Sequence, residues 1–236
     1  MTPPLTGRVA VVTGASRGIG LATARALGAA GARLTLIARD VESLSARAAE
    51  VGARAIPGDV GNAADIERIM SAFREGASAP DILVNNAGVF RPALVDATTP
   101  EALSAALEVN LVAPFRLMRA VLPAMRARGR GDIVNIGSIA DHVIFPENAA
   151  YGASKHGLRA LHDVMRTELR GTGVRLTLVS PGPVDTSLWD EIDPDTREGF
   201  TPRSRMLSPE AVAAAVLYAV SQPPEVDVEL VRLSRS

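Results

Sequence analysis

The sequence predicts a single α/β domain over residues 1–236, doubly wound around a parallel sheet of about seven strands with helices on both faces. Two observations predict this class. Short, nearly continuous apolar runs alternate with helical patterns along the chain, which is typical of parallel strands buried on both faces. No linker, repeat or low-complexity tract divides the 236 residues, and a chain of roughly this length fits one large domain.

The first half of the chain alternates four predicted strands with three predicted helices. Residues 8–13 form a β-branched run that ends at a glycine-rich turn, and the helical pattern after this turn ends at Gly31. The apolar spacing of three or four residues in the later segments is typical of helices that cover a sheet. The other strands of this half are predicted at residues 33–38, 53–57 and 81–85, and the other helices at residues 41–51 and 63–74.

The second half continues the same alternation. Residues 100–128 form one long helical stretch, which we expect to bend near Pro114 and to be interrupted around Pro123. Proline has no N–H to donate, and its ring clashes with the preceding helical turn. The remaining helices are predicted at residues 151–170 and 209–220, and the remaining strands at residues 132–136, 175–179 and 226–231.

Composition excludes several functions. The 25 Lys and Arg residues balance 26 Asp and Glu residues for a formal net charge of −1, so the basic footprint of a nucleic-acid binder is missing. The chain has no Cys and three His, which argues against a bound metal. No apolar run approaches the ~20 residues of a membrane span, and the N-terminus lacks the apolar core of a signal peptide. We expect a cytoplasmic protein that binds neither nucleic acid nor membrane.

One residue stands out from the basic residues. Lys155 is the only lysine, and all the other basic residues are arginine. A GC-rich genome explains a general preference for arginine codons, but it does not explain why a single position differs. Lysine supplies a compact ammonium whose pKa can be shifted, which arginine cannot do. Lys155 is therefore a candidate functional residue before any motif is considered.

The turn after the first predicted strand carries the glycines Gly14, Gly18 and Gly20. In α/β folds, glycines at this place allow the backbone to approach a pyrophosphate, and the N-terminus of the following helix attracts its negative charge. Tight turns also need glycine for conformational reasons alone. The position of the turn favours a dinucleotide site over a purely structural turn.

Five motifs follow one another over nearly the whole chain. They are Thr13-Gly14-Ala15-Ser16-Arg17-Gly18-Ile19-Gly20, Asn85-Asn86-Ala87-Gly88, Ser138, Tyr151-Gly152-Ala153-Ser154-Lys155 and Pro181-Gly182. In this order and spacing they resemble the motifs of the short-chain dehydrogenase/reductase family. The resemblance implies a Rossmann-type fold and an oxidoreductase that moves a hydride between a nicotinamide and a carbonyl or alcohol carbon.

The spacing and side-chain types of Tyr151 and Lys155 suit this chemistry, independently of the resemblance. These residues lie four positions apart and share a face of the predicted helix. A phenol with a pKa of about 10 exchanges protons poorly near neutrality, and a nearby ammonium would lower that pKa towards the working range. A buried structural tyrosine is the alternative. The resemblance implies that Lys155 also hydrogen-bonds the nicotinamide ribose.

Two further catalytic residues follow from the resemblance. It assigns Ser138, which follows the fifth predicted strand, the task of holding and polarising the substrate carbonyl; a serine that caps a turn is the alternative. It assigns Asn110, which lies inside the long helix, the task of holding a water that relays protons to Lys155. A solvent-facing helical asparagine is the alternative there.

The choice of cofactor depends on the end of the second predicted strand. An acid at this position would bind the ribose 2′-hydroxyl of NAD, whereas arginine accepts the 2′-phosphate of NADP. The sequence has Arg39 there and Arg17 in the glycine turn, so two cations can meet one phosphate. Two solvated surface arginines are the competing interpretation, and Asp40, one position later, keeps NAD open. We expect NADP(H).

The other cofactor contacts come from the resemblance. Asp59 and Val60 match an adenine-contacting pair, although Asp59 can also be a simple loop residue, and Thr186 matches a residue that contacts the carboxamide. The full set of expected cofactor contacts is Gly14, Ser16, Arg17, Gly18, Ile19, Gly20, Arg39, Asp59, Val60, Asn86, Ala87, Gly88, Tyr151, Lys155, Pro181, Gly182, Val184 and Thr186.

Residues 187–206 are expected to form a substrate-binding loop, and an apolar wall suggests a small or medium carbonyl or alcohol. A 3-oxoacyl thioester reductase of the same family and a non-catalytic NADP-sensing module are the alternatives, with an extended-family epimerase less favoured. The resemblance also implies a homotetramer or homodimer that pairs the helices predicted at residues 100–128 and 151–170.

Overall fold

The computed structural model describes residues 2–74 and 79–236. The strands of this part of the chain are β1 (Val9–Thr13), β2 (Arg33–Ala38), β3 (Arg54–Pro57), β4 (Ile82–Asn85), β5 (Gly131–Ile136), β6 (Val174–Pro181) and β7 (Leu230–Leu233). They form one sheet in the order β3-β2-β1-β4-β5-β6-β7, with every pair parallel. This arrangement confirms the predicted doubly wound parallel sheet.

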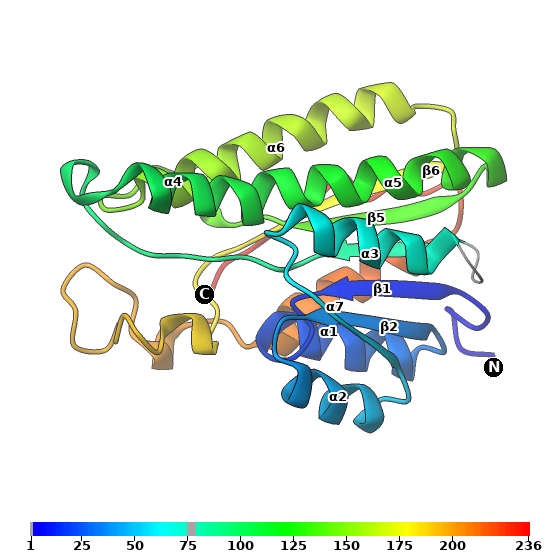
Figure 1. Ribbon diagram of the computed structural model, residues 1–236, viewed down its shortest axis with the longest axis horizontal. Coiled ribbons are helices and arrows are strands. Elements are labelled where there is room, and N and C mark those ends of the chain that lie inside the picture. Colours follow the sequence, from blue (N-terminus) through cyan, green and yellow to red (C-terminus); the bar gives the residue numbers. More distant parts are fainter. Residues whose placement is uncertain (1, 75–78) are drawn as a thin grey trace.

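Helices cover both faces of the sheet. Figure 1 shows α1, α2 and α7 on one side and α3, α5 and α6 on the other, and each set packs on its own aliphatic core. The helices are α1 (Gly18–Ala29), α2 (Val41–Glu50), α3 (Ala63–Arg74), α4 (Pro100–Leu107), α5 (Ala113–Arg128), α6 (Ala149–Leu169) and α7 (Pro209–Val220). None of the helices in the described residues is long and apolar enough to cross a membrane.

The apolar runs of the strands divide between these two cores. In β1, Val12 packs with the core under α1 and α7, whereas Val11 packs with the core under α3 and α5. In β2, Leu36 and Ile37 are divided in the same way. Successive strand residues point to opposite faces, so a strand covered on both sides needs a continuous apolar run and not an alternating one.

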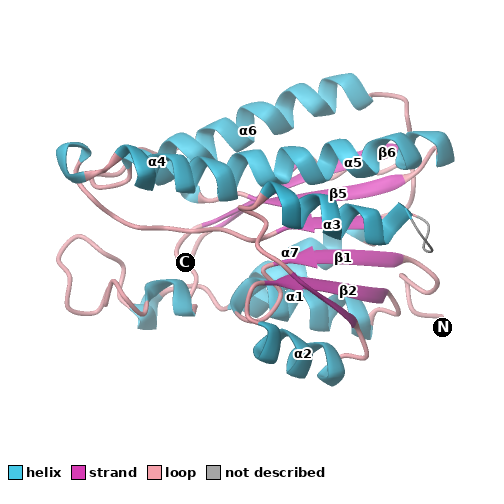
Figure 2. Cartoon of the chain, in the orientation of Figure 1, coloured by secondary structure: helices cyan, strands magenta, loops and turns pink. Residues whose placement is uncertain are grey.

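The winding of the chain reverses between β1 and β4. The chain runs from β1 through β2 to β3 at one edge, then returns to β4 beside β1 and continues outwards to β7. In doubly wound sheets, the crevice at the carboxyl ends of the strands at such a reversal binds the ligand. Figure 2 shows long loops gathered at this end of the sheet.

The long helix predicted at residues 100–128 is broken in a different way from the one expected. It divides into α4 and α5 at a π-helical turn, Glu108–Val112, where the N–H of Ala113 bonds to the carbonyl oxygen of Glu108. This turn ends two residues before Pro114, near which a bend was expected and which cannot donate to the turn before it. The expected interruption at Pro123 is wrong: α5 continues through it. Pro123 is on the exposed face, where water can hydrate the carbonyl oxygen that it leaves without a partner.

The last strand begins later than predicted. The expected strand at residues 226–231 is replaced by β7, whose pairing with β6 starts at Leu230. Residues 223–226 form a turn closed by a bond from the N–H of Val226 to the Pro223 carbonyl oxygen. Arg175 donates to the carbonyl oxygens of Pro223 and Val226, so these groups are not available to the sheet.

A buried ion cluster joins three parts of the sheet at the end opposite the crevice. The Asp132 side chain is 7% exposed and pairs with Arg8 and with the Nε of Arg175, the latter at 2.7 Å. Arg8 precedes β1, Asp132 lies in β5 and Arg175 lies in β6. One carboxylate therefore balances two partly buried arginines that come from distant parts of the sequence.

We predict that Asp132→Ala lowers the free energy of unfolding by about 3 kcal/mol, because two partly buried cations lose their buried counter-charge. Urea denaturation measures the change. Glu50→Ala is the control, since Glu50 also pairs with two arginines, Arg25 and Arg47, but on the surface. Its loss should be far smaller. Equal losses in the two variants would contradict the structural role of the Asp132 cluster.

Candidate active site

A cleft of about 1040 Å³ opens at the carboxyl end of the sheet. The segments that follow the strands β1 to β6 line it. Of the residues predicted to form the site, all line this cleft except Gly20 and Asn110. Gly20 lies against the glycine turn, and Asn110 lies behind the loop that follows β4. The structure therefore brings the predicted residues to one place.

The glycine turn has the shape that a phosphate cradle needs. Gly14 and Gly18 have φ values of +63° and +54°, which L-residues with side chains rarely adopt. A Cβ on Gly20 would lie 2.3 Å from the Gly14 carbonyl oxygen. The helix α1 begins at Gly18 without a side-chain cap, so its first N–H groups can bind an anion. The cleft and this cradle fit the pyrophosphate of a dinucleotide.

Thr13 and Asn86 hold the end of β4 against the glycine turn. The Thr13 hydroxyl accepts hydrogen bonds from the N–H groups of Asn86 and Ala87, both at 3.0 Å. The Asn86 amide donates to the carbonyl oxygens of Thr13 at 2.8 Å and Gly14 at 3.2 Å. The sequence motif included Thr13, but its anchoring role was missed. The only signal for it is a buried polar residue at the end of an apolar strand.

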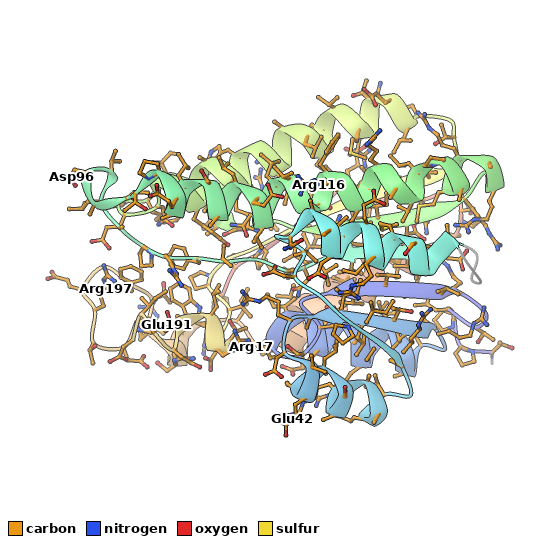
Figure 3. All side chains as sticks on the ribbon, in the orientation of Figure 1. Arg17, Glu42, Asp96, Arg116, Glu191 and Arg197 are labelled. Carbon is orange, nitrogen blue, oxygen red and sulfur yellow. The ribbon has the colours of Figure 1, made fainter. Side chains whose placement is uncertain are left out.

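The residues that bear on the choice of cofactor lie around the end of β2. Arg17 and Arg39 are both exposed and line the cleft; Figure 3 shows Arg17 between α1 and the segment of residues 187–206. The Arg39 guanidinium lies 4.0 Å from the Asp59 carboxylate and is 65% exposed. The Asp40 carboxylate accepts a hydrogen bond from the Ser43 N–H at 3.0 Å and so caps α2. Asp40 thus has a structural task of its own.

The helix α6 presents Tyr151 and Lys155 to the cleft together, which confirms that they share a face. Lys155 is 5% exposed, and its Nζ donates to the Ile136 carbonyl oxygen at 2.8 Å. The same Nζ lies 5.6 Å from the centre of the Tyr151 ring. The Tyr151 side chain hydrogen-bonds the Ser138 side chain. Ser138, Tyr151 and Lys155 therefore form one cluster at the end of β5.

The electrostatics of this cluster correct one expectation. Burial raises the pKa of the Tyr151 phenol above its ordinary value, and the hydrogen bond with Ser138 opposes this only in part. Burial also lowers the pKa of Lys155 to about 8, against the attraction of the Asp141 carboxylate. The expected net lowering of the Tyr151 pKa is therefore wrong for the protein alone, because burial is the largest cause and raises this pKa. Burial disfavours the phenolate, and the ammonium is hydrogen-bonded to Ile136 instead.

Ser138 caps a turn, which was one of the two roles that the sequence left open. Its hydroxyl accepts a hydrogen bond from the Ala140 N–H at 3.2 Å and begins a short 3₁₀ helix, Ile139–Asp141. The same side chain is the hydrogen-bond partner of Tyr151. The cap therefore fixes the position of the hydroxyl beside the phenol, and the catalytic role of Ser138 stays a prediction.

Asn110 lies in the π-helical turn and is 1% exposed, so the solvent-facing alternative is wrong. Its side-chain oxygen accepts from the Val89 N–H at 2.9 Å. Its amide donates to the Val89 carbonyl oxygen at 2.9 Å and to the Ser154 hydroxyl at 3.0 Å. Asn110 thus connects the loop after β4 to α6, one residue before Lys155.

Sequence reasoning gave no role to Asp141, although its carboxylate is fully buried. The carboxylate accepts from the Ser180 hydroxyl and, at 3.4 Å, from the Ser138 N–H. It lies 2.6 Å from His142 Nδ1 and 3.4 Å from Arg159. Its charge favours the protonated forms of both titrating groups of the cluster. The spacing Ser-x-x-Asp, typical of a capping box, is the signal that could have identified it.

Residues 187–206 lie beyond the carboxyl ends of the strands (Figure 1). Arg203 pairs with Asp185 at 2.7 Å and with Asp190 at 2.6 Å. Arg197 pairs with Glu147, which comes from the segment before α6. These ion pairs hold the segment beside the cleft, which several of its residues line.

Comparisons with known proteins agree with this geometry. Residues 8–197 match the family model described as short chain dehydrogenase. The chain is 35% identical over 239 residues to dehydrogenase/reductase SDR family member 11 of Gallus gallus, with 94% of each chain covered.

Two solved structures are similar over nearly their whole length. One is a metagenomic short-chain oxidoreductase in complex with NADP, at 36% identity, 99% coverage of both chains and a TM-score of 0.84. The other is the closed form of a serine dehydrogenase complexed with NADP+, at 30% identity, 95% and 93% coverage and a TM-score of 0.86. With its Rossmann-like sheet and matching family model, the chain belongs to the short-chain dehydrogenase/reductase family of oxidoreductases.

Proposed function

We propose that the chain is an NADP(H)-dependent oxidoreductase that interconverts a carbonyl compound and its alcohol, with Tyr151 exchanging the proton. One observation carries the proposal: a glycine cradle and the Ser138–Tyr151–Lys155 cluster line the same cleft. A cradle alone would support nucleotide binding only. A tyrosine, a serine and a buried lysine beside it add a proton donor, a hydrogen-bond donor and a positive charge.

The proposed preference for NADP over NAD rests on charge. Arg17 and Arg39 line the cleft, and two guanidinium groups suit a dianionic phosphate. Asp40, the acid that kept NAD open, is hydrogen-bonded as the cap of α2. Two similar solved structures hold NADP, which supports the same choice here. When bound, the nicotinamide supplies or accepts the hydride.

The proposed proton chemistry follows from the state of the cluster. A raised pKa keeps the Tyr151 phenol protonated near neutrality, so it can donate a proton to the oxygen of a carbonyl that is being reduced. The Ser138 hydroxyl, fixed by its cap, donates a hydrogen bond to the same oxygen. With a pKa of about 8, Lys155 is mostly an ammonium at pH 7, and its charge stabilises the phenolate that Tyr151 becomes. The proton relay through Asn110 stays a prediction.

We also propose that the chain forms a homotetramer or homodimer through the helices α4, α5 and α6. Apolar side chains are exposed there: Phe115 on α5 is 44% exposed and Val164 on α6 is 56% exposed. Pairing these helices between copies would remove this surface from water.

We predict that Tyr151→Phe abolishes carbonyl reduction but leaves NADPH affinity within about twofold, because the variant removes only the hydroxyl. Turnover is measured by NADPH absorbance over a panel of ketones, and affinity by NADPH fluorescence. General acid catalysis contributes roughly 10²–10⁴-fold to a rate, so a loss of at least 100-fold is expected. Turnover retained in the variant would remove Tyr151 from the acid–base role. Tight NADPH binding by a wild type that reduces no ketone would favour an NADP sensor.

We predict that Arg39→Asp weakens NADPH binding about tenfold or more, while NADH binding changes little. A charge-assisted hydrogen bond is worth roughly 1.5–3 kcal/mol, and 1.4 kcal/mol is about tenfold in affinity. Titration of each cofactor measures the two constants. Arg33→Asp is the matched control, since Arg33 is an exposed arginine at the opposite end of β2. Equal losses for both cofactors would show that Arg39 does not recognise the 2′-phosphate.

A further inference from the structure

The aromatic residues of this chain gather in the cleft. The chain has five Phe, two Tyr and one Trp, and the two aliphatic cores on the faces of the sheet contain none of the aromatic residues whose side chains the structure describes, a set that leaves out Phe73. Phe115 and Tyr218 are exposed on helices. The aromatic residues that line the cleft are Phe90, Phe145, Tyr151, Trp189 and Phe200. Packing of the fold therefore does not account for these five.

Four of these rings form a continuous series that starts at the proposed proton donor. The centre of the Phe90 ring lies 4.8 Å from that of Tyr151 and 5.5 Å from that of Trp189. The Trp189 ring lies 6.2 Å from Phe200. The two contacts of Trp189 are edge-to-face, the favoured geometry for aromatic pairs. Each ring is only half-buried, so the series leaves apolar ring surface open to the cleft.

The polar atom of the indole does not face a ligand. The Trp189 Nε1 donates to the Val184 carbonyl oxygen at 2.9 Å. This bond fixes the ring at the start of the segment of residues 187–206 and satisfies its one donor. What Trp189 offers to a ligand is therefore an oriented apolar ring and not a hydrogen bond.

The charges at this end of the cleft do not suit an anionic substrate. Arg197 lies 4.8 Å from the Phe200 ring and pairs with Glu147, so its charge is already balanced. Glu147 and Glu198 line the cleft. With Arg197 and Glu147 paired to each other, a substrate carboxylate or phosphate finds no free cation among them and lies near the Glu198 carboxylate, whereas an uncharged substrate avoids this repulsion.

We propose that the substrate is a neutral ketone or aldehyde, or the corresponding alcohol, that carries an aromatic ring next to the reacting carbon. The ring lies against Phe90 and Trp189, and the reacting oxygen lies at the Tyr151 hydroxyl. This inference rests on the proposed function for the reaction itself. An aromatic ring gains edge-to-face contacts that a saturated ring of the same size lacks, at roughly two- to tenfold in affinity for each ring pair.

Trp189 is the single tryptophan of the chain, so its fluorescence reports binding in the cleft without turnover. Wild-type protein is titrated with 1-phenylethanol and with 1-cyclohexylethanol, alone and with NADPH, which cannot oxidise or reduce either alcohol. The expected result is at least fivefold tighter binding of 1-phenylethanol. Reduction of acetophenone and of cyclohexyl methyl ketone by NADPH is measured in parallel, with the same preference expected in kcat/KM.

Three variants test which side chains produce the preference for 1-phenylethanol over 1-cyclohexylethanol. Phe90→Leu and Phe200→Leu remove ring contacts but leave the Trp189 reporter, and Phe115→Leu makes the same change on α5, outside the cleft. We expect the preference to fall to about twofold or less in Phe90→Leu, to be reduced in Phe200→Leu and to be unchanged in Phe115→Leu.

The outcomes separate this inference from the proposed function. Equal binding of the two alcohols, or tighter binding of the saturated one, would overturn the aromatic substrate class even if both ketones are reduced. A preference that persists in Phe90→Leu would overturn it as well. A binding preference without reduction of either ketone would support the aromatic site and contradict the proposed reaction.

Discussion

The hydrogen bond from Lys155 to the Ile136 carbonyl oxygen joins α6 to the end of β5. It places a buried ammonium in the wall of the cleft, and one helical turn earlier α6 brings Tyr151 beside Ser138. Arginine could not repeat this contact with the same geometry, because its guanidinium is larger and planar. The one lysine in an otherwise arginine-only set of cations thus stands where a compact charge is needed.

The cleft has a rigid part and a part built on loops. The cradle is fixed by the hydrogen bonds between Thr13 and Asn86 at the ends of two central strands, and the proton donor is fixed by α6. The aromatic series instead depends on residues 187–206, which ion pairs hold in place. The proposed cofactor and proton chemistry therefore depend on the sheet and on α6, and the proposed substrate choice depends on the loop.

The sheet could be predicted from the sequence, because strands buried on both faces leave continuous apolar runs. The residues of the cleft could be predicted as well, because the motifs mark the ends of strands. Properties that depend on burial could not be predicted from the sequence. The raised pKa of Tyr151 and the buried charge of Asp141 depend on which groups pack around them. The aromatic series joins Phe90 to Trp189, nearly a hundred residues apart. The interruption expected at Pro123 is absent because a proline on the exposed face of α5 is tolerated.

The pKa of Lys155 tests the central claim most directly, that a buried ammonium organises the site. In protein labelled with ¹³C-lysine, the single lysine gives one side-chain NMR signal whose shift reports its protonation. The account predicts a midpoint of about 8, and a lower midpoint in Asp141→Asn, because the carboxylate that favours the ammonium is then absent. A midpoint near the ordinary 10.5, unchanged in Asp141→Asn, would mean that Lys155 is solvated and would contradict the account.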